Sequence, residues 1–280
     1  MEQKKKREHK VFDKHPIIGS LVLAFFVYIL ANIVCVIINF PLTKFVPGYP
    51  MAGPVGVIAA FLLFNLFFCW WFRPDVESLI KGGNMKEGVR FIIVFIIYWI
   101  LGEVVSVITE GTKLAIPSFT SVSTAIYAGF FEELVFRGML IAPMLRRDQS
   151  RKSVYTALIV SSVVFGLIHG MNVIGGAPID SSIMQVVTAA LLGIIFGVAF
   201  LCTGNLWLGV LLHTVHDIIA FSNVGATSEA GIITKGVTIS TWLDLAMCIA
   251  VAVYANMYIR KEPVMNDVIK LWRGKWREGA

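Results

Sequence analysis

Nine ionisable residues fall within the apolar runs of this 280-residue sequence, and their types and spacing define the chemistry that it could perform. They are Glu103, Glu132, Glu133, Arg137, His169, His213, His216, Asp217 and Asp244. A charged side chain at the centre of a membrane helix costs about 2.5–3.5 kcal/mol. Such residues persist where they pair with each other, face the interior of a helical bundle or carry out a function. Their presence therefore indicates that the bundle has a polar interior, in which these residues form ion pairs, carry out a function or do both.

The segment EELVFR, residues 132–137, holds two carboxylates and one guanidinium. On a helix, Glu133 and Arg137 are four positions apart, so they share a face and can neutralise each other. Glu132 lies about 100° round the helix from Glu133 and does not share that partner. A carboxylate in a desolvated site can serve as a general base near neutral pH. We therefore expect an ion pair between Glu133 and Arg137, in a structural role or as part of a site, and proton transfer by Glu132.

Two segments with histidine follow along the chain. In SSVVFGLIHGMN, Phe165 and His169 are four positions apart, and His169 ends the predicted helix. Alone, such a histidine is more often an interfacial residue than a functional one. In NLWLGVLLHTVHDIIAF, His213 and Asp217 share one helical face, and His216 lies near the edge of that face. Because every buried polar group needs a partner, this last segment favours a functional site over simple packing.

Other polar or small residues within the runs have simpler explanations. Glu103 and Asp244 are single carboxylates in otherwise apolar helices, and we expect each to be satisfied by a neighbouring group or a water molecule. Gly193 and Gly197 have the spacing of a helix-dimer motif, but close packing inside the bundle is the better explanation. None of these four residues is placed in the candidate site.

The elements that must position the candidate residues are membrane helices. The chain is 57% hydrophobic and 15% charged, with a mean hydropathy of +0.77, whereas soluble domains carry about 25% charged residues. The apolar runs are continuous and approach the roughly 20 residues that one crossing needs, and an open sheet could not satisfy its backbone in lipid. We predict an all-α, multi-pass transmembrane bundle with a polar catalytic cavity between the fourth, fifth and seventh spans. The eight predicted spans are 16–40, 52–72, 89–109, 121–145, 153–171, 181–203, 205–223 and 237–259.

The basic residues predict the orientation of the chain. Of its 24 Lys and Arg residues, 19 lie in residues 1–15 and 260–280 and in loops 73–88 and 146–152, and the alternate loops hold only Lys44, Lys113 and Lys235. Since positive charge marks the cytoplasmic side, both termini are predicted to be cytoplasmic. The net charge of +6 is thus a topology signal, and a nucleic-acid partner is not expected. We expect disordered ends, at roughly 1–14 and 261–280, although Trp272 and Trp276 among cations also suit a segment on an anionic leaflet.

The three motifs resemble those of a known family. EExxxR (Glu132, Glu133, Arg137), FxxxH (Phe165, His169) and HxxxD (His213, Asp217) stand in this order on separate predicted spans. Together with Asn205, which begins the predicted helix of the third motif, they are similar to the motifs of the CPBP intramembrane proteases. That family includes CAAX prenyl proteases and bacteriocin-processing or bacteriocin-immunity proteins and is also called Abi. The resemblance covers about 120–220, within a predicted membrane protease domain of 16–260 between basic cytoplasmic tails at 1–15 and 261–280. His216 matches no position of the motifs.

The resemblance implies a water molecule activated by Glu132 and His169 for attack on a peptide carbonyl, with His213 and Asp217 stabilising the oxyanion or completing the site. A divalent metal such as zinc is one option, with Glu132, His169 and His213 as candidate ligands, although the chain has no HExxH motif. In a metal-independent site, Glu132 is the general base and His213 the oxyanion donor. An ionised Asp217 would oppose the negative charge of the oxyanion, which favours a metal or a protonated Asp217.

Two other functions stay open at this stage. Intramembrane carboxylates and histidines also form the proton relays of transporters, but the sequence lacks paired Gly- or Pro-broken helices in matching halves. A non-proteolytic membrane regulator or bacteriocin self-immunity protein could use the same fold, because fold does not fix function. The expected partners are the lipid bilayer of the cell membrane and a peptide or protein substrate, whose identity and prenylation state the sequence does not specify.

Overall fold

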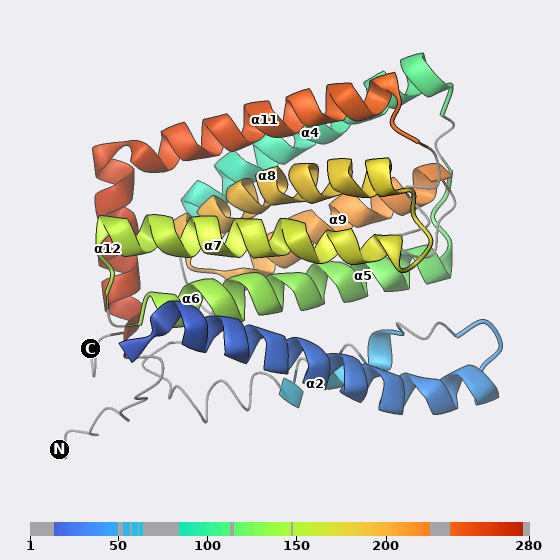
Figure 1. Ribbon diagram of the computed structural model, residues 1–280, viewed down its shortest axis with the longest axis horizontal. Coiled ribbons are helices and arrows are strands. Elements are labelled where there is room, and N and C mark those ends of the chain that lie inside the picture. The colour runs from blue at the N-terminus through green and yellow to red at the C-terminus, as the bar shows by residue number, and fades with distance from the viewer. Residues whose placement is uncertain are drawn as a thin grey trace.

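The chain forms a bundle of long helices, shown in Figure 1 as a computed structural model. It describes residues 14–49, 53–56, 58–60, 62–63, 84–112, 115–146, 148–224 and 236–276. Within these ranges the regular structure is entirely helical, which confirms the predicted fold class. The elements are α2 (Pro16–Phe45), α4 (Met85–Glu110), α5 (Phe119–Glu133), η1 (Leu134–Ile141), α6 (Ala142–Met144), α7 (Arg151–His169), η2 (Gly170–Val173), α8 (Ile179–Thr203), α9 (Leu206–Val224), α11 (Ile239–Arg260) and α12 (Glu262–Trp276).

Seven of the eight predicted spans coincide with these helices. The predicted 121–145 span is one continuous helical stretch. It is divided into α5, η1 and α6 because its central part is a π-helix with an α-helix on either side. Five helices are long and apolar enough to cross a bilayer, namely α2, α4, α7 with η2, α8 and α11, and α9 is a shorter apolar helix. The predicted 52–72 span lies for most of its length outside the described residues.

Helix α8 is the centre of the bundle. Its most apolar stretch is 67% buried, whereas the corresponding stretch of the peripheral α4 is 17% buried. Small residues allow this burial: a Cβ on Gly193 would lie 3.1 Å from Cα of Ser162 in α7, and one on Gly197 would lie 2.5 Å from a side-chain carbon of Leu158. The expected packing role of the two glycines inside the bundle is thereby confirmed.

The turn from α8 to α9 is tight, as the one-residue gap between the predicted spans 181–203 and 205–223 requires. Helix α8 ends at Thr203, and Gly204 adopts a φ of +62°, a left-handed conformation that glycine adopts without steric penalty. Asn205 then caps α9, since its side-chain oxygen accepts a hydrogen bond of 2.9 Å from the backbone N–H of Trp207. This turn sets α8 and α9 side by side and running in opposite directions (Figure 1).

The expectation of a disordered C-terminal end is wrong for residues 262–276. They form α12, which crosses the end of the bundle at a steep angle to the other helices (Figure 1). The Trp272 side chain is fully buried, packs edge-on against Phe200 at 5.2 Å, and donates a hydrogen bond of 2.9 Å to the Leu201 carbonyl. A buried indole with a satisfied N–H provides the packing that a solvated tail lacks.

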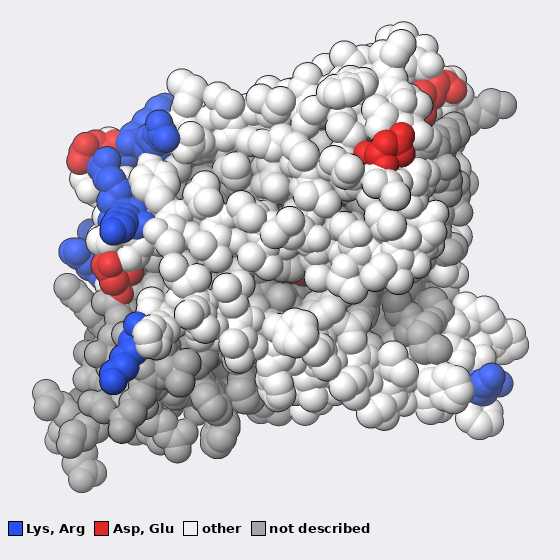
Figure 2. Space-filling model, viewed as in Figure 1, with Lys and Arg blue, Asp and Glu red and all other residues white. Residues whose placement is uncertain are grey.

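Positive charge gathers at the end of the bundle that α12 covers. Figure 2 shows the described Lys and Arg side chains of this face gathered mainly there, with a smaller blue patch at the opposite end. The wide surface between is almost free of charge on this face, which matches a belt in contact with lipid. The bundle is therefore that of a membrane protein with one strongly basic end.

Candidate active site

A buried ion pair lies where α5 passes into η1. Nη1 of Arg137 is 3.1 Å from Oε1 of Glu133, and both side chains are fully buried. Nη2 of Arg137 donates a hydrogen bond of 3.3 Å to the Gly193 carbonyl in α8, and its guanidinium lies 4.5 Å from the centre of the Phe165 ring in α7. The expected ion pair is present, and it fixes Arg137 against three parts of the bundle.

The π-helix η1 begins directly after Glu133 and contains Arg137. A π-helix changes the direction in which side chains leave the helix and is common at functional sites. Ser161 of α7 donates a hydrogen bond of 2.9 Å to the Phe136 carbonyl within this segment. The widened turn is thus supported by a neighbouring helix at the point where the charged residues enter the core.

His213 of α9 is the residue on which the carboxylates converge. Its Nδ1 lies 3.2 Å from Oε1 of Glu133, and its Nε2 lies 3.8 Å from Oε2 of Glu132 and 3.7 Å from Oδ1 of Asp217. The imidazole stacks on the Phe196 ring of α8 with centroids 5.1 Å apart. Carboxylates from two helices therefore surround one buried imidazole, whose orientation is set by both hydrogen bonding and stacking.

Two glycines let α5 and α9 approach closely enough for these contacts. A Cβ on Gly209, one turn before His213, would lie 2.5 Å from Oε2 of Glu133. A Cβ on Gly129 would lie 2.7 Å from the backbone nitrogen of Thr214. Since real Cβ atoms essentially never come within 3.0 Å of another atom, the absence of a side chain at both positions is a condition of the site geometry.

His169 ends α7 and is mostly buried, at 8% exposure. Its Nδ1 lies 2.7 Å from the Phe165 carbonyl, to which it donates, so that Nε2 of the neutral ring is left as the acceptor. The Phe165 ring lies 4.9 Å from the His169 ring and 5.7 Å from the His213 ring, measured between centroids. One aromatic ring therefore joins the second and third sequence motifs.

His216, which has no counterpart in the motifs, is close enough to His169 and His213 to interact with them electrostatically and also faces α4. Its ring lies 5.9 Å from that of Tyr98 in α4. The Tyr98 hydroxyl donates a hydrogen bond of 2.8 Å to Asp244, whose other oxygen lies 3.9 Å from Sγ of Cys248. Asp244 is thus satisfied by neighbouring side chains, as expected.

In this arrangement the candidate ligands Glu132, His169 and His213 are not grouped round one position. Among the residues that the structure describes, no three His, Cys, Asp or Glu side chains are grouped as ligands of one ion. The Glu133 oxygen nearest to His213 is also bonded to Arg137, which occupies it with a guanidinium.

The sequence motifs did not identify the contribution of α8. Phe196 stacks on the imidazole of His213, and the Gly193 carbonyl accepts from Arg137. The only signal in the sequence was the GIIFG segment, which indicates close helix packing and carries no polar side chain. The site thus lies among α5 with η1, α7, α8 and α9, rather than among the fourth, fifth and seventh spans alone.

A comparison with protein families covers the stretch of chain that holds this site. Residues 114–219 match the family model described as Type II CAAX prenyl endopeptidase Rce1-like, and this stretch contains all six candidate residues. The match is consistent with a CPBP family intramembrane protease and confirms the resemblance seen in the motifs. At family level it implies a CAAX-protease-like intramembrane endopeptidase. No curated protein and no solved structure matches the chain.

Proposed function

We propose that this chain, whose residues 114–219 match the Rce1-like family model, is an intramembrane endopeptidase that uses a water molecule activated by Glu132 and His169. The observation that carries the proposal is the convergence of Glu132, Glu133 and Asp217 on His213 inside a membrane bundle. Three carboxylates and one guanidinium are too many charges for packing alone, because each needs compensation in a low-dielectric interior.

Glu133 and Arg137 act as positioning residues in this mechanism. Oε1 of Glu133 accepts from Nδ1–H of His213, which directs Nε2 of the same ring toward Glu132 and Asp217. Arg137 holds Glu133 in place through the 3.1 Å ion pair. The carboxylate therefore keeps Nδ1 of His213 protonated and sets the orientation of the ring, as second partners of catalytic histidines commonly do.

Glu132 and His169 act on the attacking water. Glu132 accepts a proton as the water oxygen bonds to the peptide carbonyl carbon, and it delivers that proton to the leaving nitrogen as the C–N bond breaks. His169 orients the water through Nε2, because its Nδ1–H is engaged by the Phe165 carbonyl. The Phe165 ring, which contacts both histidines, limits the volume in which the water can sit.

His213 stabilises the oxyanion through its Nε2 when both ring nitrogens are protonated. Three carboxyl groups face one guanidinium here, so protons on His213 or Asp217 bring the cluster closer to neutrality. A protonated Asp217 removes the charge that would oppose the oxyanion. In this arrangement His213 supplies the hydrogen-bond donor for the oxyanion, and the protons on His213 and Asp217 offset the negative charge of the cluster.

The basic end of the bundle supports an orientation of the protein in the membrane. We place that end, with both termini, on the cytoplasmic side of the cell membrane, on the basis of the charge distribution in Figure 2. The substrate is then a peptide or a membrane-associated protein that reaches the polar cluster from within or across the bilayer.

The test compares purified wild type with Glu132→Gln against a library of quenched peptides in detergent, together with elemental analysis for bound metal. Cleavage by the wild type alone supports the proposal, and a metal content well below one per chain supports the metal-independent form. Full cleavage by Glu132→Gln would contradict the role of Glu132 as the base, and full activity of that variant in cells without any cleavage would favour a regulator that binds rather than cleaves. Matched thermal unfolding of the two proteins shows whether a loss of cleavage reflects chemistry or folding.

A further inference from the structure

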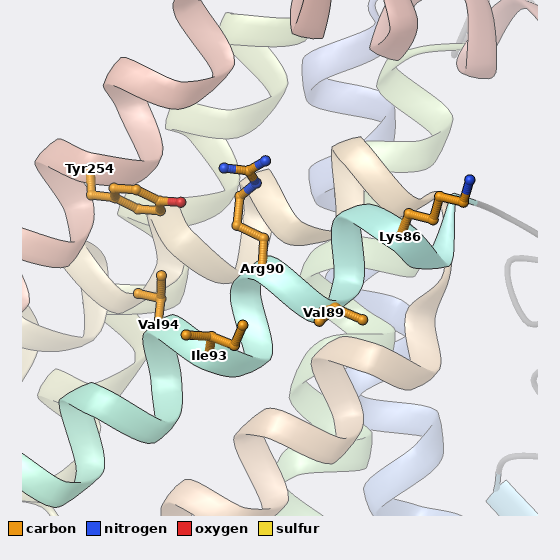
Figure 3. A pocket seen from close by; sticks show the side chains of 6 residues that line it. All are labelled: Lys86, Val89, Arg90, Ile93, Val94 and Tyr254. Atoms are coloured by element: carbon orange, nitrogen blue, oxygen red, sulfur yellow. The ribbon is translucent and has the colours of Figure 1, made fainter.

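A groove lies on the outside of the bundle between α4 and α11, close to its basic end. It has a volume of about 360 Å³ and is lined by Lys86, Val89, Arg90, Ile93, Val94 and Tyr254 (Figure 3). We call it the α4–α11 groove. None of these residues takes part in the candidate active site, so the groove is a separate feature of the molecule.

The end of the groove nearest the basic end of the bundle is cationic. Lys86 and Arg90 are four residues apart on α4, both are exposed, and Figure 3 shows their side chains leaving the same helix beside the groove. Two cations at this spacing can both donate hydrogen bonds to the oxygens of one phosphate group. Such a group is what the headgroup region of an anionic leaflet presents at this level.

Arg90 is held in position rather than extended freely. Its guanidinium lies 4.5 Å from the centre of the Tyr258 ring, and its Nε lies 3.6 Å from a carboxylate oxygen of Glu87. The Tyr254 hydroxyl points at the same guanidinium in Figure 3. Glu87 is itself hydrogen-bonded by the Tyr258 hydroxyl, and with two cations beside this single carboxylate the site keeps an excess of positive charge.

The rest of the groove is apolar and faces the lipid. Val89 and Ile93 are 55% and 52% exposed and belong to the apolar surface that covers the sides of the bundle. From Lys86 to Ile93 the helix rises roughly 10 Å, at 1.5 Å per residue. The lining therefore changes from cationic to apolar over the depth that separates a phosphate from the first part of an acyl chain.

We propose that the α4–α11 groove binds one anionic phospholipid, with its phosphate between Lys86 and Arg90 and an acyl chain along Val89 and Ile93. Charge complementarity selects an anionic lipid over a zwitterionic one, and the apolar half selects a lipid over a free anion. The proposal is independent of the proteolytic function, because it concerns the lipid-facing surface.

The first test measures lipid binding by native mass spectrometry of delipidated protein with phosphatidylglycerol or phosphatidylcholine. We expect the wild type to bind the first phosphatidylglycerol more tightly than phosphatidylcholine, and the double variant Lys86→Gln/Arg90→Gln to bind it about tenfold more weakly. The matched control, Lys152→Gln/Lys270→Gln, removes two exposed cations from the same end of the bundle and should bind as the wild type does. An equal loss in both double variants would show non-specific attraction and overturn the proposal.

The second test changes the apolar half alone. Ile93→Trp fills the groove and leaves both cations in place, so it should weaken binding of the first phosphatidylglycerol. Unchanged affinity would show that no acyl chain occupies the groove and would overturn the proposal. Inorganic phosphate should fail to displace the bound lipid; displacement at millimolar phosphate would identify a free-anion site instead.

Discussion

Oε1 of Glu133 lies 3.1 Å from Nη1 of Arg137 and 3.2 Å from Nδ1 of His213. One buried carboxylate oxygen therefore joins the guanidinium of η1 to the imidazole of α9, which stands 80 residues later in the chain. Glu133 is more than a local partner of Arg137, since it also sets the orientation of the histidine toward which the other carboxylates point.

Replacing Glu133 with alanine should strongly destabilise the protein, because Arg137 would remain buried without its carboxylate. Breaking a buried pair from one side costs about 3–5 kcal/mol. The free energy of unfolding, measured by titration with a denaturing detergent, checks this value. The double variant Glu133→Leu/Arg137→Met should lose less than the sum of the two single replacements, and additive losses would argue against a coupled pair.

Replacing Glu132 with glutamine should separate chemistry from folding. We expect cleavage to fall by about 10²–10⁴-fold, the usual contribution of a general base, with little change in the unfolding midpoint. Turnover of a cleaved library peptide, measured beside thermal unfolding, gives both quantities. A variant that kept its turnover would remove Glu132 from the mechanism.

Replacing Asp217 with asparagine tests the charge that faces His213 at 3.7 Å. The amide keeps the size of the side chain, removes the ionisable group and can donate to an oxyanion. We therefore expect Asp217→Asn to stay within about tenfold of wild-type turnover, whereas Asp217→Ala loses about 100-fold because it removes the donor as well. If both variants lost activity equally, Asp217 would act as an obligatory carboxylate instead.

The sequence predicted the residues of the site better than it predicted their partners. The four-residue spacings identified the Glu133–Arg137 pair because a helix places such residues on one face. The contacts between His213 and the two glutamates depend on how α5 packs on α9, which no local spacing encodes. The same limit explains Phe196, whose apolar side chain gave no sign of a functional contact.

The fold was predictable where length and hydropathy decide it. Continuous apolar runs gave the helices, and Thr203-Gly204-Asn205 gave the turn between α8 and α9. The π-helix η1 was not predicted, because its wider turn is supported by Ser161 of another helix. Helix α12 was expected to be disordered, since the burial of Trp272 against Leu201 becomes apparent only in three dimensions.

Replacing Gly209 with alanine should impair catalysis through geometry alone. The added Cβ would lie 2.5 Å from Oε2 of Glu133, so the carboxylate must shift and take His213 out of alignment. A displacement of about 1 Å can lower turnover by about 100-fold. Gly274→Ala is the matched control, because a Cβ there meets nothing within 4 Å and alanine stabilises a helix by about 1 kcal/mol relative to glycine. Turnover and the unfolding midpoint of both variants check the prediction: normal turnover in Gly209→Ala would mean that the position of Glu133 does not control His213.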